Sequence, residues 1–162
     1  MTRTKIKDRI LPTYTKGEEI FNMTSHIVGA ALGVVSLVLC VIFSAIHVNG
    51  LAVISSIIYG VSMILLYSMS SIYHGLNKKT VAKKIFQIFD HCSIFLLIAG
   101  TYTPYLLVSL RGKTGWTIFI ILWAFTVIGI VFDSVMLEKF RKIEMLLYVG
   151  MGWCILFASG SL

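Results

Sequence analysis

Long stretches without a charged residue or a histidine constrain this chain more than any other feature of its sequence. Five such stretches, of 20, 26, 19, 19 and 18 residues, lie between or after segments that carry charged or histidine side chains. About 18 mostly apolar residues are enough for a helix to cross the ~30 Å hydrocarbon core of a bilayer. The sequence therefore predicts five membrane spans, at about residues 27–46, 51–73, 88–109, 115–132 and 145–162.

The composition supports a protein embedded in lipid. Hydrophobic residues make up 57% of the 162 positions and charged residues 13%, which is too little polar surface for a soluble domain. The apolar residues do not alternate, so a membrane β-barrel is excluded. We expect an all-α integral membrane bundle, in which residues 1–25 form a basic leader and a short interfacial helix before a transmembrane domain at 26–162. A possible capping box from Thr15 to Glu18 indicates where the first helix begins.

Positive charge is distributed unequally between the two predicted sides of the membrane. Twelve of the 14 Lys and Arg residues precede span one or follow spans two and four, and the other two, Arg111 and Lys113, follow span three. By the positive-inside rule the N-terminus is cytoplasmic. Because orientation accounts for the net charge of +7, nucleic acid is not an expected partner. The expected partners are membrane lipids.

A small set of polar residues falls at one predicted depth, near the cytoplasmic ends of spans one to three. Glu19, Asn22 and His26 share one stripe of a helix, Ser70 and His74 are an i, i+4 pair, and Asp90 begins span three. Taken singly, each has an ordinary explanation as a polar group at a helix end, where charge costs less than at the bilayer centre. Together they form a candidate site.

Three further polar residues, His47, His91 and Asp133, are weaker candidates. His91 follows Asp90 directly, so on a helix the two side chains point about 100° apart and do not readily serve one centre.

Three motifs resemble the hemolysin III family when read in order. They are Glu19-x-x-Asn22-x-x-x-His26, then Ser70-x-x-x-His74, then Phe89-Asp90-His91 followed by Leu97-Ile98-Ala99-Gly100-Thr101-Tyr102-Thr103-Pro104. That family is the bacterial branch of the progestin and adipoQ receptors and is more distantly similar to the alkaline ceramidases. The resemblance implies seven membrane helices, a bacterial plasma membrane and a cytoplasmic N-terminus.

The resemblance also implies a chemistry. In the receptor branch, zinc is held by a histidine matching His74 and by two more from a His-x-x-x-His motif on the seventh helix. Residues matching Ser70 and Asp90 lie close by and assist a metal-bound water. A site of this kind would be an intramembrane hydrolase that cleaves a lipid amide such as a ceramide, because zinc with an open position lowers the pKa of its bound water to about 7.

The chain departs from the family pattern in its length. It has five predicted spans and no His-x-x-x-His motif, which indicates a chain that ends before the last two helices. We therefore expect zinc to be weakly bound or absent here, and the chain to be inactive as a hydrolase unless a missing piece is supplied. Two other functions stay open: a non-enzymatic sensor or structural bundle, and a membrane-damaging, cytolytic protein.

Overall fold

Five α-helices make up most of the fold. A computed structural model describes residues 5–136, 141–154 and 156. The helices are α1 (Lys16–His47), α2 (Gly50–Gly75), α3 (Val81–Pro104), α4 (Gly112–Met136) and α5 (Arg141–Trp153). Two short elements complete the order: η1 (Ile6–Asp8), a 3₁₀ turn, and η2 (Tyr105–Leu110), a π-helical continuation of α3. The regular structure of the described residues is all helical, as predicted.

Side-chain caps fix where the first three helices begin. The predicted capping box is confirmed: the backbone N–H of Glu18 donates to Oγ1 of Thr15 at 3.3 Å, and the N–H of Thr15 donates to Oε2 of Glu18 at 2.7 Å. Asn49 caps α2 and Thr80 caps α3 in the usual way, by accepting an N–H of the first turn. As a result, α3 begins at Val81, seven residues before the predicted start of span three.

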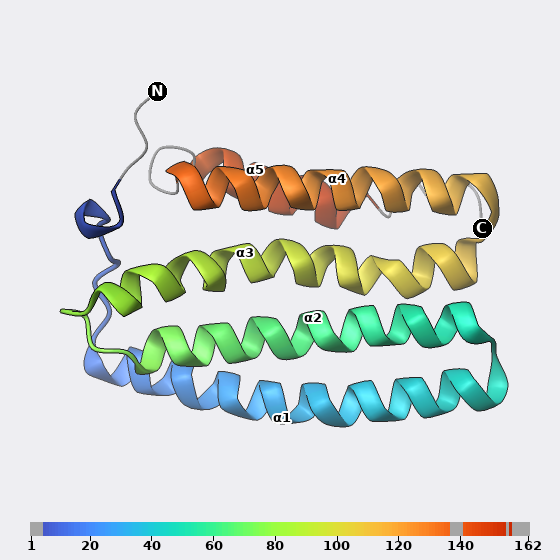
Figure 1. Ribbon diagram of the computed structural model, residues 1–162, viewed down its shortest axis with the longest axis horizontal. Coiled ribbons are helices and arrows are strands. Elements are labelled where there is room, and N and C mark those ends of the chain that lie inside the picture. Colours follow the sequence, from blue (N-terminus) through green and yellow to red (C-terminus); the bar gives the residue numbers. More distant parts are fainter. Residues whose placement is uncertain (1–4, 137–140, 155, 157–162) are drawn as a thin grey trace.

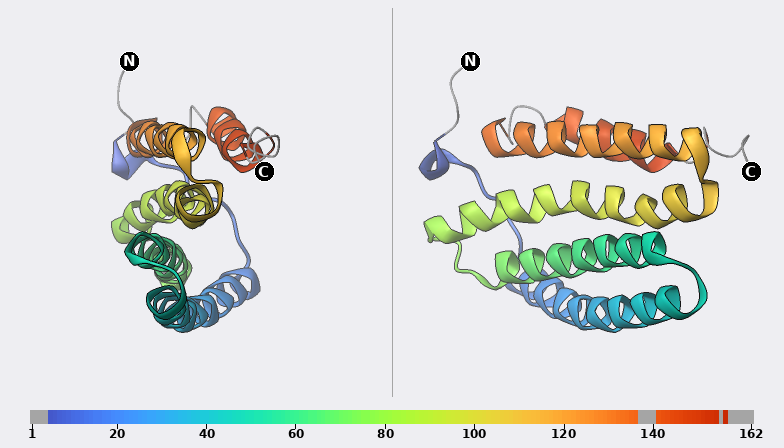
Figure 2. Two further views of the ribbon diagram at one scale, coloured as in Figure 1. Left: turned by 90° about the vertical axis from the view of Figure 1, so that its right-hand side faces the viewer. Right: turned by 45° about the vertical axis from the view of Figure 1, so that its right-hand side comes forward.

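The helices run antiparallel and follow one another around an open arc. Each packs against the next in the chain, and α5 also contacts α3. Figure 1 shows the bundle from the side, and the left view of Figure 2 shows it from one end, with α1 and α5 at the two ends of the arc. The N-terminal segment, the connection from α2 to α3 and the end of α4 all lie at one end of the bundle.

Four helices are long and apolar enough to cross a membrane: Lys16–His47, Gly50–Gly75, Val81–Leu110 and Gly112–Val135. These include the first four predicted spans. Many large apolar side chains on α1 point outward, for example Leu32, Leu39 and Phe43, each about 60% exposed, as expected for a helix that faces lipid. The fifth helix, Arg141–Trp153, has only 13 residues. Positions 155 and 157–162 of the fifth predicted span lie outside the described residues.

Close backbone contact holds α1 against α2. A Cβ added at Gly29 would lie 2.7 Å from the ring of Tyr67, and one at Gly33 would lie 3.1 Å from Ile64. Small residues one turn apart let helices approach closely in lipid, so Gly29 and Gly33 form a contact face of α1 toward α2. On the other side of the bundle, Phe95 and Leu122 centre an apolar core between α3, α4 and α5.

Candidate functional site

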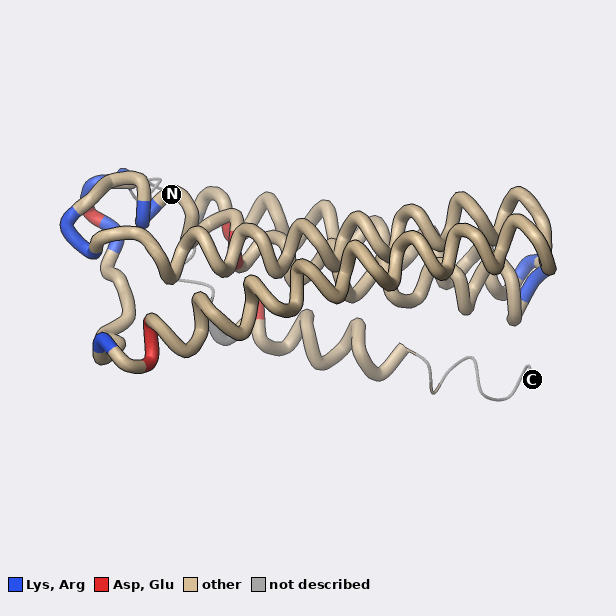
Figure 3. The backbone as a smooth tube through the Cα atoms, turned by 90° about the horizontal axis from the view of Figure 1, so that it is seen from below, with Lys and Arg blue, Asp and Glu red and all other residues tan. Residues whose placement is uncertain are grey.

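The end of the bundle that carries the N-terminus also carries most of the positive charge. Figure 3 shows Lys and Arg gathered there, with a smaller group at the opposite end, where Arg111 and Lys113 join η2 to α4. The charge asymmetry counted along the sequence is therefore a spatial asymmetry between the two ends. The antiparallel packing places the first turns of α1 beside the last turns of α2, and so brings predicted site residues together.

Glu19 and His74 form a buried pair between α1 and α2. Oε2 of Glu19 lies 2.7 Å from Nδ1 of His74, and each residue is 8% exposed. A carboxylate accepts only, so Nδ1 is the donor in this bond. In the neutral imidazole the lone pair is then on Nε2, which is free to bind a metal or to take a proton. The first and second predicted motifs thus share one contact.

Lys83 adds a positive charge to this pair from the first turn of α3. It is 1% exposed, and its Nζ lies 3.0 Å from Oε1 of Glu19. The ammonium also donates to the carbonyl oxygens of Tyr73 at 2.9 Å and Leu76 at 3.2 Å, at the C-terminal end of α2. Glu19, His74 and Lys83 therefore join α1, α2 and α3, and we call them the Glu19 cluster.

Sequence reasoning missed Lys83, which it counted as one of several loop charges. Its burial follows from the early start of α3 at Val81, because the added turns carry Lys83 and Gln87 into the bundle. The cap at Thr80 was the signal that could have revealed this start.

The other predicted residues surround this pair at greater distance. The ring centroid of His26 lies 6.1 Å from that of His74, and Asp90 lies close enough to His26 for a charge interaction. The Nδ1 atom of His26 is buried and has no hydrogen-bond partner among the described residues. Ser70 is buried one turn before His74, and Asn22 is partly buried on α1.

These residues do not complete a metal site in the described part of the chain. No three ligand atoms around His74 lie within 4.8 Å of one another among residues 5–136, 141–154 and 156. Nδ1 of His74 is occupied by Glu19, which leaves Nε2 as its one ligand atom. One imidazole is too few for stable zinc binding, which in catalytic sites takes three protein ligands.

A groove opens beside the Glu19 cluster. Its volume is about 540 Å³, and it is lined by Glu19 and His74 together with Lys16, Lys78 and Lys79. A cavity of about 500 Å³ at the opposite end of α1 is lined mostly by apolar side chains. Lys, Arg, Asp and Glu side chains are absent from the lining of the second space, whereas the basic rim of the first suits a negatively charged or strongly polar group.

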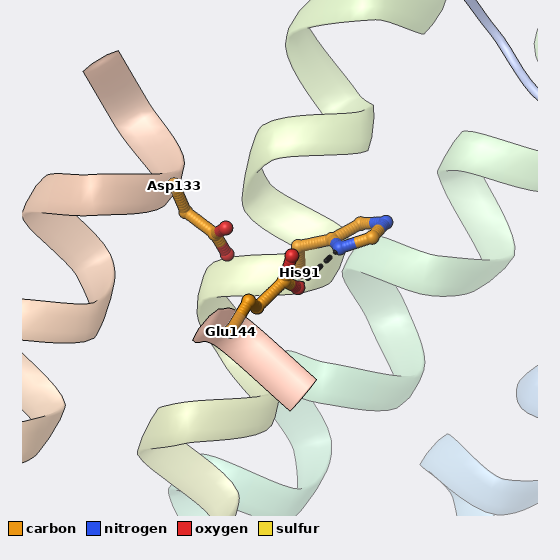
Figure 4. Close-up of side chains that lie close together, drawn as sticks. All are labelled: His91, Asp133 and Glu144. Carbon is orange, nitrogen blue, oxygen red and sulfur yellow. Dashed lines mark hydrogen bonds and ion pairs between the residues drawn. The ribbon is translucent and has the colours of Figure 1, made fainter. Parts of the chain in front are cut away.

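Three helices meet at a second polar cluster, drawn in Figure 4: His91 of α3, Asp133 of α4 and Glu144 of α5. Nδ1 of His91 lies 2.7 Å from Oε1 of Glu144. The sequence marked His91 and Asp133 as weaker candidates and did not connect them with Glu144. The available signal was that Asp133 is the only ionisable residue between Lys113 and Glu138.

Comparison with known proteins agrees with the three motifs. The family model described as Haemolysin-III related matches residues 14–161. Hemolysin-3 of Bacillus cereus is 43% identical over 141 residues, covering 87% of this chain and 64% of the relative. The Hemolysin-3 homolog of Bacillus subtilis (strain 168) is 39% identical over 145 residues, covering 90% of this chain and 68% of the relative.

The match leaves part of the relatives uncovered, because the chain spans about two thirds of their length, 64% and 68%. No solved structure matches the chain. The family model nevertheless covers nearly all of the sequence, and its description agrees with a bundle of long apolar helices. The chain is a multi-pass membrane protein and belongs to the haemolysin-III-related family.

Proposed function

We propose that this chain forms part of a membrane-embedded hydrolase that cleaves an amide bond in a lipid such as a ceramide. The observation that carries the proposal is the buried 2.7 Å contact between Glu19 and His74. A carboxylate that holds one imidazole nitrogen orients the ring and fixes which nitrogen carries the proton, as in many hydrolytic sites.

The surroundings of the pair suit a lipid headgroup. The groove of about 540 Å³ opens between the basic side chains of Lys16, Lys78 and Lys79, and the exposed apolar faces of α1 and α2 adjoin it. A lipid whose polar head enters this groove would leave its acyl chains along those faces. The head of such a lipid carries the amide that His74 would reach.

Ser70 and Asp90 take supporting roles in this proposal. Ser70 lies one helical turn before His74 and is 3% exposed, and in this proposal its hydroxyl would donate to a developing oxyanion once substrate is bound. Asp90 interacts electrostatically with His26, and its carboxylate is the candidate for positioning the attacking water.

In this proposal zinc is the cofactor of the longer relatives, in which the residue matching His74 would be one ligand. The residues described here supply too few ligand atoms around His74 for that ion, and we derive no reaction step through it. The relatives are longer than this chain, and the remaining ligands would come from their additional length.

The orientation in the membrane is part of the same proposal. The Lys-rich and Arg-rich end of the bundle (Figure 3) would face the cytoplasm, by the positive-inside rule. The Glu19 cluster and its groove would then lie at the cytoplasmic face of a bacterial plasma membrane.

The test compares this chain with a version lengthened to the full extent of its relatives. Each is purified in detergent, assayed for zinc by mass spectrometry and assayed for cleavage of a fluorescent ceramide. We expect cleavage in the longer protein alone, together with one zinc per chain more than this chain holds. In the longer protein, His74→Ala should remove that additional zinc and the cleavage, and Ser70→Ala the cleavage, while His47→Ala at the opposite end serves as the matched control. A longer protein with no additional zinc and no cleavage would refute the proposal.

A second candidate is a non-enzymatic sensor or structural bundle, favoured by the burial of Lys83. An ammonium 1% exposed that bonds α1 and α2 at once is typical of a structural connection. In that case, substitutions of Ser70, His74 and Asp90 would lower thermal stability, and no ceramide turnover would be found in either version. The Bacillus relatives are named hemolysins, so dye release from liposomes is measured alongside and would favour membrane damage instead.

A further inference from the structure

The cluster of His91, Asp133 and Glu144 has the geometry of a small ligand cage. Each residue comes from a different helix, and one ligand atom from each lies within 4.8 Å of the other two. Figure 4 shows the three side chains converging between α3, α4 and α5. The cage shares no residue with the Glu19 cluster. Its His91 directly follows Asp90, which has a supporting role in the proposed hydrolase.

The two carboxylates of the cage are buried with acceptor capacity to spare. Asp133 is 2% exposed and Glu144 is 6% exposed. Within the described residues, Oδ2 of Asp133 and Oε2 of Glu144 have no hydrogen-bond partner. A buried carboxylate oxygen without a partner is costly, so these atoms indicate a missing positive group or proton.

Nearby charges balance the cage only in part. The guanidinium of Arg9 is buried beside it, and its Nη2 donates to the backbone carbonyl oxygens of Ser134 at 2.9 Å and Asp133 at 3.4 Å. The hydroxyl of Tyr148 lies 2.8 Å from Oε1 of Glu144 and 3.1 Å from the carbonyl oxygen of His91. These contacts hold the backbone and one carboxylate oxygen in place, and they leave Oδ2 of Asp133 and Oε2 of Glu144 without a hydrogen-bond partner among the described residues.

We propose that His91, Asp133 and Glu144 bind a divalent transition-metal ion, Zn²⁺ or Mn²⁺. One imidazole nitrogen with two carboxylate oxygens is a mixed donor set that suits these ions, whereas Mg²⁺ and Ca²⁺ prefer oxygen ligands alone. The ion would take the place of the proton between Nδ1 of His91 and Oε1 of Glu144. Because metal–ligand bonds are about 2.0–2.2 Å long, ligand atoms spread over 4.8 Å need only small side-chain movements to meet one ion.

The bound ion would act as a cross-link between α3, α4 and α5. Tyr148 would orient Glu144 from behind, which is the usual arrangement of a supporting hydrogen bond at a metal ligand. Arg9 would connect the N-terminal segment to the same place through Asp133 and Ser134. This site goes beyond the proposed hydrolase and does not depend on it.

The test uses the full chain in detergent micelles after removal of metal with a chelator. Equilibrium dialysis against Zn²⁺ and against Mn²⁺, followed by mass spectrometry, should give about one ion per chain, with Mg²⁺ bound at least tenfold more weakly. The isosteric double variant Asp133→Asn with Glu144→Gln should lose at least about tenfold in affinity. His74→Ala, in the Glu19 cluster, should bind as the unaltered chain does.

Three outcomes would overturn this assignment. They are a chain that takes up no ion, a double variant that binds normally, and binding that is lost in His74→Ala but kept in the double variant. The third would move the ion to the proposed hydrolase site, so the two proposals fail separately.

A spectroscopic measurement covers the case in which the double variant does not fold. The Mn²⁺ complex of the unaltered chain should show nitrogen hyperfine coupling in pulsed electron paramagnetic resonance. That coupling should disappear in His91→Ala and persist in His26→Ala, with helical content checked by circular dichroism. A Mn²⁺ complex of the unaltered chain without nitrogen coupling would exclude His91 as a ligand and overturn the assignment.

Discussion

The Glu19 cluster and the His91–Asp133–Glu144 cage lie in the same half of the bundle but differ in how their buried carboxylates are paired. In the first, one carboxylate meets an imidazole at 2.7 Å and an ammonium at 3.0 Å. In the second, two carboxylates share one imidazole, and the nearby guanidinium bonds backbone carbonyl oxygens. Each cluster has at least one buried carboxylate oxygen without a hydrogen-bond partner among the described residues. In the first cluster that oxygen, Oε1 of Glu19, is balanced by the ammonium of Lys83 at 3.0 Å, whereas in the second both carboxylates, Asp133 and Glu144, have such an oxygen.

Because of this difference, the charges of the Glu19 cluster mainly stabilise the fold, whereas the cage has the capacity to bind a cation. A balanced buried cluster needs nothing further and loses much when one member is removed. A cage with spare acceptors has a use for a cation or a proton.

The largest expected effect comes from Lys83→Met, which keeps the length of the side chain and removes its charge. Glu19 would keep His74 but lose its buried ammonium, and two carbonyl oxygens of α2 would lose their donor. Removing one partner of a buried pair costs about 3–5 kcal/mol. We expect the free energy of unfolding, measured by denaturant titration in mixed micelles, to fall by that amount.

Lys79→Met is the matched control, because Lys79 is exposed in the neighbouring loop. Its effect should stay within about 0.5 kcal/mol. The double variant Glu19→Gln with Lys83→Met should lose less than the sum of its single variants, because the two residues interact directly. Equal stability of Lys83→Met and Lys79→Met would show that the Glu19 cluster is not balanced in the way described.

The sequence predicted the fold well, because its signals are local. Uncharged stretches mark the first four long helices, and the Thr15–Glu18 box marks the start of α1. The i, i+4 spacing of Ser70 and His74 follows from helix geometry alone. Glu19 and His74 meet at one end of the bundle because α1 and α2 are adjacent antiparallel helices joined by a short turn.

The cage and the burial of Lys83 were beyond that reasoning. His91, Asp133 and Glu144 come from three helices, so their meeting depends on the rotation of each helix about its own axis, which no spacing in the sequence determines. Rotation in lipid is set by packing, here by contacts such as Gly129 against Phe95. Lys83 was misread because a lysine near a predicted span end is ordinarily a solvated charge.

The next effect in size tests the packing that positions the cage. A Cβ at Gly129 would lie 2.4 Å from the ring of Phe95, which is fully buried. Gly129→Ala should therefore push α4 away from α3 and cost about 1–3 kcal/mol, as overpacking does. Asp133 lies one turn further along the same face of α4, so the cage should loosen while the Glu19 cluster stays intact.

Hydrogen–deuterium exchange is the measurement that distinguishes the two regions. In Gly129→Ala, exchange should quicken in peptides from α3 and α4 around Phe95 and Asp133, and should be unchanged around Glu19. Gly150→Ala is the control, since no heavy atom lies within 4 Å of its added Cβ, and a helix gains from losing glycine. Faster exchange at both clusters would mean that they open as one cooperative unit, and the two regions would then not be independent.

The smallest expected effect is a difference in stability between variants of two tyrosines. Each of these tyrosines connects α3 and α5 by a hydrogen bond, one from α5 and the other from α3. The Tyr148 hydroxyl of α5 meets Oε1 of Glu144 and the carbonyl of His91, while the Tyr102 hydroxyl of α3 donates to the carbonyl of Gly152. Both Tyr→Phe changes keep the ring. A hydrogen bond to a charged acceptor contributes about 1.5–3 kcal/mol and one to a neutral acceptor about 0.5–1.5.

Tyr148→Phe should therefore destabilise the chain by about 1 kcal/mol more than Tyr102→Phe, in the same unfolding assay without added metal. The difference between the two variants is the informative quantity, because the loss of a hydroxyl is common to both. A larger loss at Tyr148 requires that the Glu144 carboxylate is ionised inside the cage. Equal losses would mean that the cage holds a proton in place of the charge, and the contrast with the Glu19 cluster would then be one of protonation and not of unpaired charge.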